Sequence, residues 1–329
     1  MKNPVYVMGH SEFELQRLER QDRLIGPSTR VYLQAAGIAP GMRVLDVGSG
    51  SGIVSFMAAE LVGPTGEVVG IDRAPAAVAA ARAAAAARAL ANLSFREGDP
   101  VDMAYERPFD AVVGRYVLMF QADASAMLPG LARHLRPGGV IVFHEPDWSV
   151  VHSDPVAPTY DHCCRWIVDT FERAGTGTNM RSRLHRALLD AGLPPPAMRM
   201  QTMIGDASRA AEWLRAVADL AIALIPAMEQ HHVATSVDID GDSLADRLIQ
   251  EVAAGEGSSW VALRSVLGRE YRGVERNLDC AGLRLGRCRF LAQLALGPAT
   301  ALRPKPGLRS TTGIRPIEAS KATVSYVRL

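Results

Sequence analysis

Short apolar runs alternate with longer amphipathic or alanine-rich stretches over the first 150 residues. Runs that end in glycine, proline or an acidic residue predict buried strands, and the longer stretches between them predict helices. The predicted strands are 44–47, 67–71, 93–96, 109–113 and 140–143, with helices at 53–62, 75–91 and 122–134. This alternation predicts an α/β fold with a mostly parallel sheet covered by helices on both faces.

Further helices flank this core on both sides. Ser11-Glu12-Phe13-Glu14 has the spacing of a capping box and predicts a helix to about Arg23. Pro27 predicts the start of a second helix that ends near Gly37. Beyond residue 150 the pattern predicts helices at 157–174, 181–192, 207–229 and 241–253, and one strand at 198–204. We interpret the apolar stretch 220–228 as a helix over a pocket.

The stretch 44–52 combines a strand, a tight loop and a helix start. Glycines at 48, 50 and 52 alternate directly after the first predicted strand. In an open α/β sheet this loop is where a nucleotide-like ligand binds, because glycines let the backbone approach and the helix N-terminus offers free N–H groups. The spacing is G-x-G-x-G, which differs from the dinucleotide fingerprint G-x-G-x-x-G and disfavours an oxidoreductase.

Two acidic residues follow the next two strands. Asp72 ends the second predicted strand, 20 residues beyond Gly52, where a carboxylate can accept both hydroxyls of a ribose. Asp99 follows the third strand, where a carboxylate can accept an adenine amino group. The carboxyl ends of parallel strands meet in one crevice, so the loop and both acids are expected to form one site.

The glycine loop resembles motif I of the class I S-adenosylmethionine (SAM) methyltransferases. Residues 1–205 are similar to small-molecule members related to the ubiquinone/menaquinone C-methyltransferases. They most resemble a natural-product subgroup whose N-terminal pattern Tyr-x-x-Gly-x-Ser-x-x-Glu-x-x-Arg-Leu starts here at Tyr6. The blocks 109–115 and 135–139 also resemble that subgroup. The resemblance implies a Rossmann-like, doubly wound sheet with a helical cap, and SAM as cofactor.

The resemblance and the positions of residues at the strand ends together give the expected site residues. The expected cofactor-binding residues are Asp46, Gly48, Ser49, Gly50, Asp72, Arg73, Gly98, Asp99, Pro100 and Arg115. Asp46 either binds the cofactor or only orients the loop. The expected walls of the acceptor pocket are Tyr6, Tyr116, Trp148 and Tyr160.

A base is needed only if the methyl acceptor must lose a proton. His144 and Glu145 at the end of the fifth strand are the candidates, with Tyr6 beside the methyl group as a third. The alternative for His144 and Glu145 is a purely structural role with hydrogen bonds to their neighbours. The alternative for Tyr6 is packing under its own helix.

Composition and charge narrow the class of protein. Apolar residues make up 48% and charged residues 22% of the 329, as in ordinary globular proteins. Cys163, Cys164, Cys280 and Cys288 have neither disulfide-framework nor zinc-site spacing, so no metal is expected. No signal peptide or membrane-length apolar run is recognised, so we expect a cytoplasmic protein without a membrane partner.

The charge is unevenly distributed. Residues 264–329 carry 13 Lys and Arg against 4 Asp and Glu, a net charge of +9, and the remainder carries −8. The acidic body lacks the basic stripe of a nucleic-acid-binding protein, so no nucleic-acid partner is expected. After about residue 255 the chain no longer resembles the family, whose final strand is not recognisable here. The tail is interpreted as disordered, as translated out of frame, or as a genuine basic tail.

These observations predict four regions: N-terminal cap helices at 1–30, a SAM-binding core at 31–150, cap helices and final strands at 151–265, and the atypical tail at 266–329. The predicted activity is SAM-dependent methyl transfer to carbon, nitrogen or oxygen of a small, secondary-metabolite acceptor. The alternatives are a regulatory protein that binds SAM or S-adenosylhomocysteine without transfer, and an RNA methyltransferase. A homodimer is a further expectation, because an N-terminal helix can exchange between protomers.

Overall fold

The fold was analysed in a computed structural model of the 329-residue chain. The structure describes residues 8, 12–149, 151–154, 156–203, 210–254, 260–261 and 263–269. All of them belong to one compact unit, Met1–Glu275. The second unit, Arg276–Leu329, and with it most of the predicted basic tail, lies outside the described residues.

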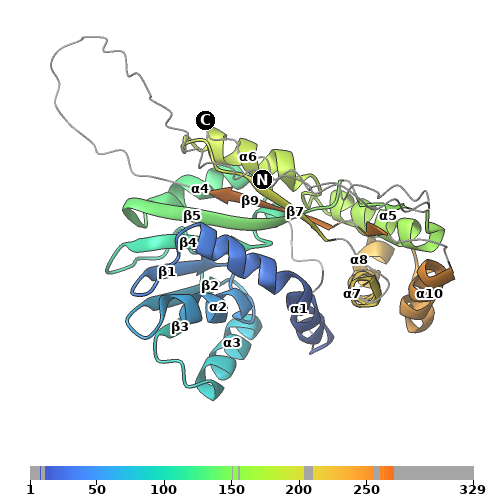
Figure 1. The fold of residues 1–329 in the computed structure, drawn as a ribbon, viewed down its shortest axis with the longest axis horizontal. Coiled ribbons are helices and arrows are strands. Elements are labelled where there is room, and N and C mark those ends of the chain that lie inside the picture. Colours follow the sequence, from blue (N-terminus) through green and yellow to red (C-terminus); the bar gives the residue numbers. More distant parts are fainter. Residues whose placement is uncertain are drawn as a thin grey trace, which may run out of the picture. The chain divides into compact units, whose positions relative to one another are not determined.

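Five neighbouring strands of a seven-stranded sheet are parallel, in the order β3-β2-β1-β4-β5 from one edge (Figure 1). Their bounds are Arg43–Val47 for β1, Glu67–Asp72 for β2, Leu93–Glu97 for β3, Phe109–Arg115 for β4 and Leu135–Asp147 for β5. The chain runs outward from β1 to β3 and then returns to the other side of β1 with β4. The predicted doubly wound, mostly parallel α/β sheet is therefore confirmed, and its direction reverses between β1 and β4.

Two later strands extend the sheet beyond β5. β9 (Leu263–Arg269) pairs antiparallel with β5 on one side and with β7 (Arg199–Met203) on the other. The backbone of Val266 lies opposite both Glu145 and Met200. A separate two-stranded pair joins β6 (Ser153–Asp154) to β8 (Trp260–Val261). The stretch 263–269 thus lies inside the sheet, between β5 and β7.

Each face of the sheet is covered by its own helices, because successive strand residues point to opposite faces. Val44, Val68 and Val113 pack with α2 (Ile53–Val62) and α3 (Pro75–Ala87) in one apolar cluster. Leu45, Val69 and Val112 belong to the larger cluster on the opposite face. That cluster includes side chains of α4 (Ala124–Ala132), α5 (Pro158–Arg173), α6 (Met180–Asp190), α7 (Ala210–Ala223), α8 (Ile225–Gln230), α9 (Ser236–Ile239) and α10 (Gly241–Ala254).

The N-terminal region differs from the two helices expected there. A single helix, α1, runs from Glu12 to Ala35 and contains Pro27. Proline has no N–H and usually interrupts a helix. Here burial on both sides of it keeps the helix continuous, since Ile25 is in one apolar cluster and Tyr32 in the other. Figure 1 shows α1 passing along the sheet and beyond it toward α7.

The other sequence boundaries agree with the structure to within a few residues, with two exceptions. The predicted helix at 207–229 is two helices, α7 and α8, and the predicted strand at 140–143 is the much longer β5. A short 3-10 helix, η1 (Leu118–Phe120), follows β4. Within the described ranges, no helix is both long and apolar enough to pass through a lipid bilayer.

Candidate functional site

The loop between β1 and α2 adopts a conformation that only glycine accepts readily. Gly48, Gly50 and Gly52 all have positive φ, at 64°, 53° and 92°. A Cβ atom at Gly48 would lie 2.9 Å from Val117, and one at Gly52 would lie 2.7 Å from Phe95. A Cβ at Gly50 would meet no atom within 4 Å, so this position faces open space. The loop is therefore packed from behind and leaves room for a ligand in front of Gly50.

Asp72 at the end of β2 is tied to that loop. Its Oδ2 accepts a hydrogen bond from the Gly50 N–H at 2.8 Å, and its Oδ1 accepts one from the Ala74 N–H at 2.8 Å. A carboxylate offers about four lone-pair positions, so both oxygens can accept a further hydrogen bond. Asp72 thus holds the glycine loop and can still accept hydroxyl groups of a ribose.

The residues after β3 lie at the edge of the site. Asp99 forms an ion pair with Arg73 at 2.5 Å and accepts a hydrogen bond from the Val101 N–H at 2.9 Å. Arg73 and Pro100 line the adjoining cavity, whereas Gly98 and Asp99 are not among its lining residues. The structure thus places Asp99 behind Arg73 and Pro100, and its expected contact with adenine would have to be made from the rim.

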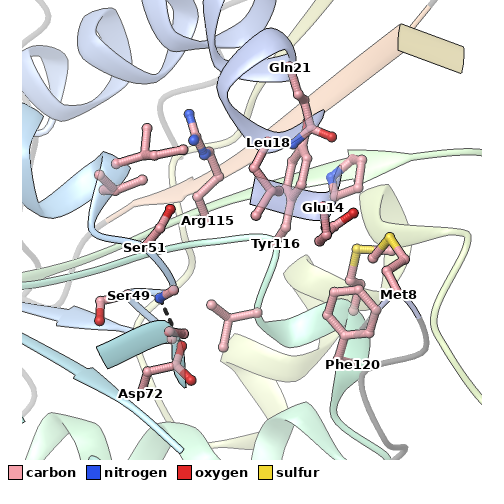
Figure 2. A pocket seen from close by; sticks show the side chains of 18 of the residues that line it. Met8, Glu14, Leu18, Gln21, Ser49, Ser51, Asp72, Arg115, Tyr116 and Phe120 are labelled. Carbon is pink, nitrogen blue, oxygen red and sulfur yellow. Dashed lines mark hydrogen bonds between the residues drawn. The ribbon is translucent and has the colours of Figure 1, made fainter. Parts of the chain in front are cut away.

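A cavity of about 670 Å³ opens between the carboxyl ends of β1, β2 and β4 and the helices α1 and α7. Such a volume suits a cofactor or another small organic molecule. Figure 2 shows Ser49, Ser51 and Asp72 on one side of this space, with Glu14, Leu18 and Gln21 of α1 on the other. Of the expected cofactor residues, the cavity lining includes Gly48, Ser49, Gly50, Asp72, Arg73, Pro100 and Arg115.

Arg115 at the end of β4 connects the sheet to α1. Its guanidinium donates to Asp22 Oδ1 at 2.6 Å and to Thr29 Oγ1 at 3.1 Å. The Arg115 side chain is 7% exposed and that of Asp22 is 29% exposed, so this ion pair is partly shielded from water. Arg115 therefore lines the cavity while it fixes the position of α1 above it.

Asp46 does not line the cavity. Its side chain is buried below the loop, where Oδ2 accepts a hydrogen bond from the Ser55 hydroxyl at 2.5 Å. Burial raises the pKa of Asp46 to about 7, because its effect is larger than that of the hydrogen bond from Ser55, which lowers the pKa. Of the two roles expected for Asp46, the structure supports orientation of the loop, because the carboxyl joins β1 to α2.

The structure does not bring His144 to the cavity. The ring is buried, its Nδ1 lies 3.0 Å from Thr29 Oγ1, and it makes an edge contact with Tyr32. Burial, reinforced by the charge of Arg115, lowers the pKa of His144 to about 3, so the imidazole is neutral and a weak base. The expectation of a catalytic base here is corrected: His144 packs under α1.

Glu145 also has a structural position. Its carboxylate accepts hydrogen bonds from the backbone N–H groups of Val117, Leu118 and Met119, at 3.0, 2.9 and 3.2 Å. Burial raises the pKa of Glu145 to about 7, and the three N–H groups oppose that rise. Glu145 is fully buried and is not part of the cavity lining, so it supports the chain after β4 and does not face a ligand.

Only some of the aromatic residues expected in the acceptor pocket line the cavity. Tyr116 and Trp148 line the cavity. Tyr116 has a positive φ of 59°, which is uncommon for a residue other than glycine. Its N–H donates a hydrogen bond to the His144 carbonyl at 3.0 Å, which stabilises this conformation. Tyr160 is a correction: it is fully buried behind Trp213, whose Nε1 donates to the Tyr160 hydroxyl at 3.1 Å. Tyr6 lies outside the described residues.

Several lining residues were not expected from the sequence. Two groups stand out, one on α1 and the other on η1, α5 and α7. They are Glu14, Leu15, Arg17, Leu18, Gln21, Leu24 and Ile25 on α1, and Met119, Phe120, Phe171, Trp213, Val217 and Leu220 on the other elements. Helical periodicity marks such residues as buried but does not distinguish a cavity from the core, so only the apolar stretch that starts at Leu220 was connected with a pocket.

The cavity fits the cofactor that the resemblance implies. Ser49 Oγ is buried at the loop and has no hydrogen-bond partner among the described residues. This atom is closed off from the cavity and offers no contact to a ligand there. The fit rests on the open space at Gly50 and on the remaining lone pairs of Asp72, which provide room and acceptors for a ribose.

The core of the chain is similar to known methyltransferases. Residues 38–179 match the family described as a methyltransferase domain. Over 116 residues, 35% of this chain and 41% of the relative, the chain is 44% identical to a nocamycin O-methyltransferase of Saccharothrix syringae. Over 121 residues, 36% of this chain and 55% of the relative, it is 43% identical to an aklanonic acid methyltransferase of a Streptomyces species. The matched stretches thus span about half of these relatives.

A 2-phytyl-1,4-naphtoquinone methyltransferase of Synechococcus elongatus is 36% identical over 123 residues, 36% of this chain and 52% of that protein. Among solved structures, a geranyl diphosphate methyltransferase in complex with GPP and sinefungin aligns with 76% of this chain and 80% of its own, at 18% identity and a TM-score of 0.48.

Proposed function

We propose that this chain, whose core is a class I SAM-dependent methyltransferase domain, transfers a methyl group from SAM to a small, largely apolar acceptor of secondary metabolism. One observation carries the proposal: a single cavity joins the glycine loop and Asp72 to a group of large apolar side chains. A methyltransferase needs this arrangement, because the methyl donor and the acceptor must meet in one enclosed space.

The polar part of the cavity suits the cofactor. Gly50 leaves room for the backbone to approach the ligand, Asp72 accepts the ribose hydroxyls, and Pro100 contributes an apolar wall toward the rim. SAM supplies a methyl group on a positively charged sulfur, which is transferred by in-line displacement. The chain contributes mainly the alignment of donor and acceptor.

The apolar part suits the acceptor. Phe120, Trp148, Phe171, Trp213 and Leu220 line it, and the Trp148 and Phe171 rings pack edge to face with centroids 6.3 Å apart. Aromatic walls of this kind favour a flat, apolar molecule such as a fused-ring compound. The printed names of the nocamycin, aklanonic acid and naphtoquinone methyltransferases agree with a small-molecule acceptor.

The proposal covers transfer to carbon, nitrogen or oxygen, by a protein of the cytoplasm that can form a homodimer. Neither His144 nor Glu145 reaches the cavity, so an acceptor that must lose a proton needs another base or must ionise by itself. Tyr6 is the third candidate, on the basis of the N-terminal sequence pattern alone.

The first test is binding of S-adenosylhomocysteine, measured by the thermal unfolding of the parent and of Asp72→Ala. A ligand at about 100 times its Kd stabilises the folded state by about 2.7 kcal/mol, which is a rise of several degrees in the unfolding temperature. We expect this rise in the parent and its loss in Asp72→Ala, because the variant lacks both the ribose acceptor and the support of Gly50. Asp102→Ala, which removes an exposed carboxylate outside the cavity, should respond like the parent.

Methyl transfer is tested with SAM carrying a deuterated methyl group and a panel of fused-ring phenols and carboxylic acids, with mass spectrometry of the products. Labelled product supports the proposal. Tight binding without transfer to any acceptor would favour the regulatory alternative, and label in added RNA would favour an RNA methyltransferase. No response to S-adenosylhomocysteine in the folded parent would contradict both the cofactor and the function.

A further inference from the structure

One face of α7 lies against the cavity. Its lining residues are Trp213, Ala216, Val217 and Leu220. They are three or four residues apart, which places them on the same side of the helix. Trp213 has the only aromatic side chain of α7, and the other three side chains are small or aliphatic. The indole of Trp213 is therefore the one ring that α7 contributes to the cavity wall.

Trp213 is held in place by Tyr160 of α5. The Trp213 Nε1–H donates a hydrogen bond to the Tyr160 hydroxyl at 3.1 Å. Tyr160 is fully buried and does not line the cavity, and only 7% of Trp213 is exposed. A buried indole N–H needs an acceptor, and this bond also fixes the direction of the ring. Because an indole has a single N–H, Trp213 offers a ligand only apolar surface.

The same face of α5 carries a second ring of the cavity wall. Phe171 follows Tyr160 by about three helical turns, so both lie on one side of α5, and both are buried. Phe171 lines the cavity and packs edge to face with Trp148 and Phe120, at centroid distances of 6.3 and 6.5 Å. These three rings hold one another, whereas Trp213 is held by its hydrogen bond to α5.

The size of the cavity gives this bond a consequence. A volume of about 670 Å³ has to hold the cofactor and the acceptor together. A pocket for a single drug-sized ligand already takes about 300–1,000 Å³. The room for the acceptor is therefore limited, and a bulky ring fixed in its wall decides whether a larger ring system fits.

We propose that Trp213 limits the size of the methyl acceptor, and that Tyr160 is the positioning residue that keeps the indole in place. The end of the acceptor that meets Trp213 is an apolar ring edge or face, because the one donor of the indole is used within the protein. The inference rests on the proposed function and deepens it, since it assigns the choice between smaller and larger acceptors to one contact between α5 and α7.

The test uses two fluorescent probes that each carry one hydroxyl group, 2-naphthol with two fused rings and 1-hydroxypyrene with four. Binding to the full chain is measured by fluorescence anisotropy with S-adenosylhomocysteine at saturation, so that the probe can occupy only the acceptor part. Apolar area alone favours the larger probe, so tighter binding of 2-naphthol by the parent indicates a limit on size. In Trp213→Leu the ratio of the two Kd values should change by about tenfold or more in favour of 1-hydroxypyrene.

Tyr160→Phe keeps both rings and removes only the hydrogen bond. It should change the same ratio in the same direction by about two- to tenfold, as expected for one hydrogen bond. In the Trp213→Leu background Tyr160→Phe should have no further effect on the ratio, because the indole that it positions is absent. This double variant also leaves no buried N–H without a partner, which keeps the comparison possible if Tyr160→Phe alone folds poorly.

A spectroscopic measurement tests the positioning role without an acceptor. The chain has four tryptophans, and each gives one indole N–H signal in a nitrogen–proton correlation spectrum. The signal of Trp213 is the one missing in Trp213→Leu. It should move in Tyr160→Phe, while the other three signals stay in place, because a hydrogen bond shifts the resonance of its own proton.

Trp166→Phe is the matched control. Trp166 is on α5 and half-buried, but it does not line the cavity. This variant should keep the parent ratio of Kd values and the Trp213 signal. The affinity for S-adenosylhomocysteine, measured by isothermal titration calorimetry, should stay within about twofold of the parent value in every variant. Circular dichroism verifies that each variant is folded.

The outcomes separate the inference from the proposed function. A changed ratio with unchanged affinity for S-adenosylhomocysteine supports the role of Trp213. An unchanged ratio in Trp213→Leu, tighter binding of 1-hydroxypyrene by the parent, or a parent that binds neither probe contradicts it while the cofactor assignment stands. A Trp213 signal that does not move in Tyr160→Phe contradicts the role of Tyr160. Failure of the parent to bind S-adenosylhomocysteine contradicts the proposed function itself.

Discussion

Asp46 and Glu145 show how burial decides the role of an acidic residue. Both were candidates for the site, and both instead support the chain around it. Asp46 accepts a hydrogen bond from Ser55 of α2, and Glu145 accepts from three backbone N–H groups after β4. The carboxylates that do line the cavity are partnered differently: Asp72 accepts from the glycine loop, and Glu14 accepts from Arg17. The chemistry of a residue type is therefore not enough to assign it to a ligand.

The raised pKa of Asp46 predicts a pH-dependent stability. Its pKa is about 7 in the folded chain and 3.8 for a free aspartate, the value that applies in the unfolded chain, so folding favours the protonated acid. The resulting stabilisation is present below pH 3.8 and is lost as the pH rises toward 7. The parent should therefore lose stability relative to Asp46→Asn over this interval, by at most about 1.4 kcal/mol per pH unit.

Urea unfolding of the parent and Asp46→Asn at several pH values between about 4 and 8 measures this difference. Asp102→Asn, an exposed change, should follow the parent throughout. A difference between parent and Asp46→Asn that does not vary with pH would show that Asp46 titrates normally.

At the level of elements, α1 performs two tasks in its two halves. Its first half lines the cavity up to Ile25, and its second half packs on the sheet through Tyr32 and Leu33. Pro27 lies between the halves and is exposed. Two ion pairs hold the first half in place, Arg20 with Asp219 of α7 at 2.7 Å and Asp22 with Arg115 at 2.6 Å.

Pro27→Ala should therefore stabilise the chain. The substitution restores an N–H inside the helix and removes a proline ring from an exposed position, so we expect the free energy of unfolding to rise by about 1–3 kcal/mol. Urea unfolding measures this, with the exposed Arg23→Ala as a control that should change stability by no more than about 0.5 kcal/mol. A less stable Pro27→Ala would mean that α1 depends on the interruption at this position.

For the whole molecule, β9 determines how the sheet is completed. This strand comes from the last described part of the chain and separates β5 from β7. Without it, β5 would be an edge strand along its C-terminal half, next to Glu145 and the chain that follows β4. The backbone of β9 pairs antiparallel with both of its neighbours.

Val266→Pro tests that placement. Proline in a central strand cannot donate its ladder hydrogen bond, so we expect a loss of about 3 kcal/mol or more, seen as a lower unfolding temperature by circular dichroism. Val266→Thr keeps the N–H and should retain most of the stability. A melt of Val266→Pro identical to that of the parent would mean that residues 263–269 do not complete the sheet.

Local patterns along the chain were enough to establish the strand–loop–helix order of the core, the glycine loop and Asp72, because these depend on neighbouring residues and on glycine at positive φ. They also located most strands and helices to within a few residues, since periodicity is a property of short segments. The three-dimensional arrangement was needed to show that α1 is continuous, that β9 lies between β5 and β7, and that His144, Glu145 and Tyr160 are buried away from the cavity. Those outcomes depend on contacts between residues far apart in the chain, where packing and desolvation outweigh local preference.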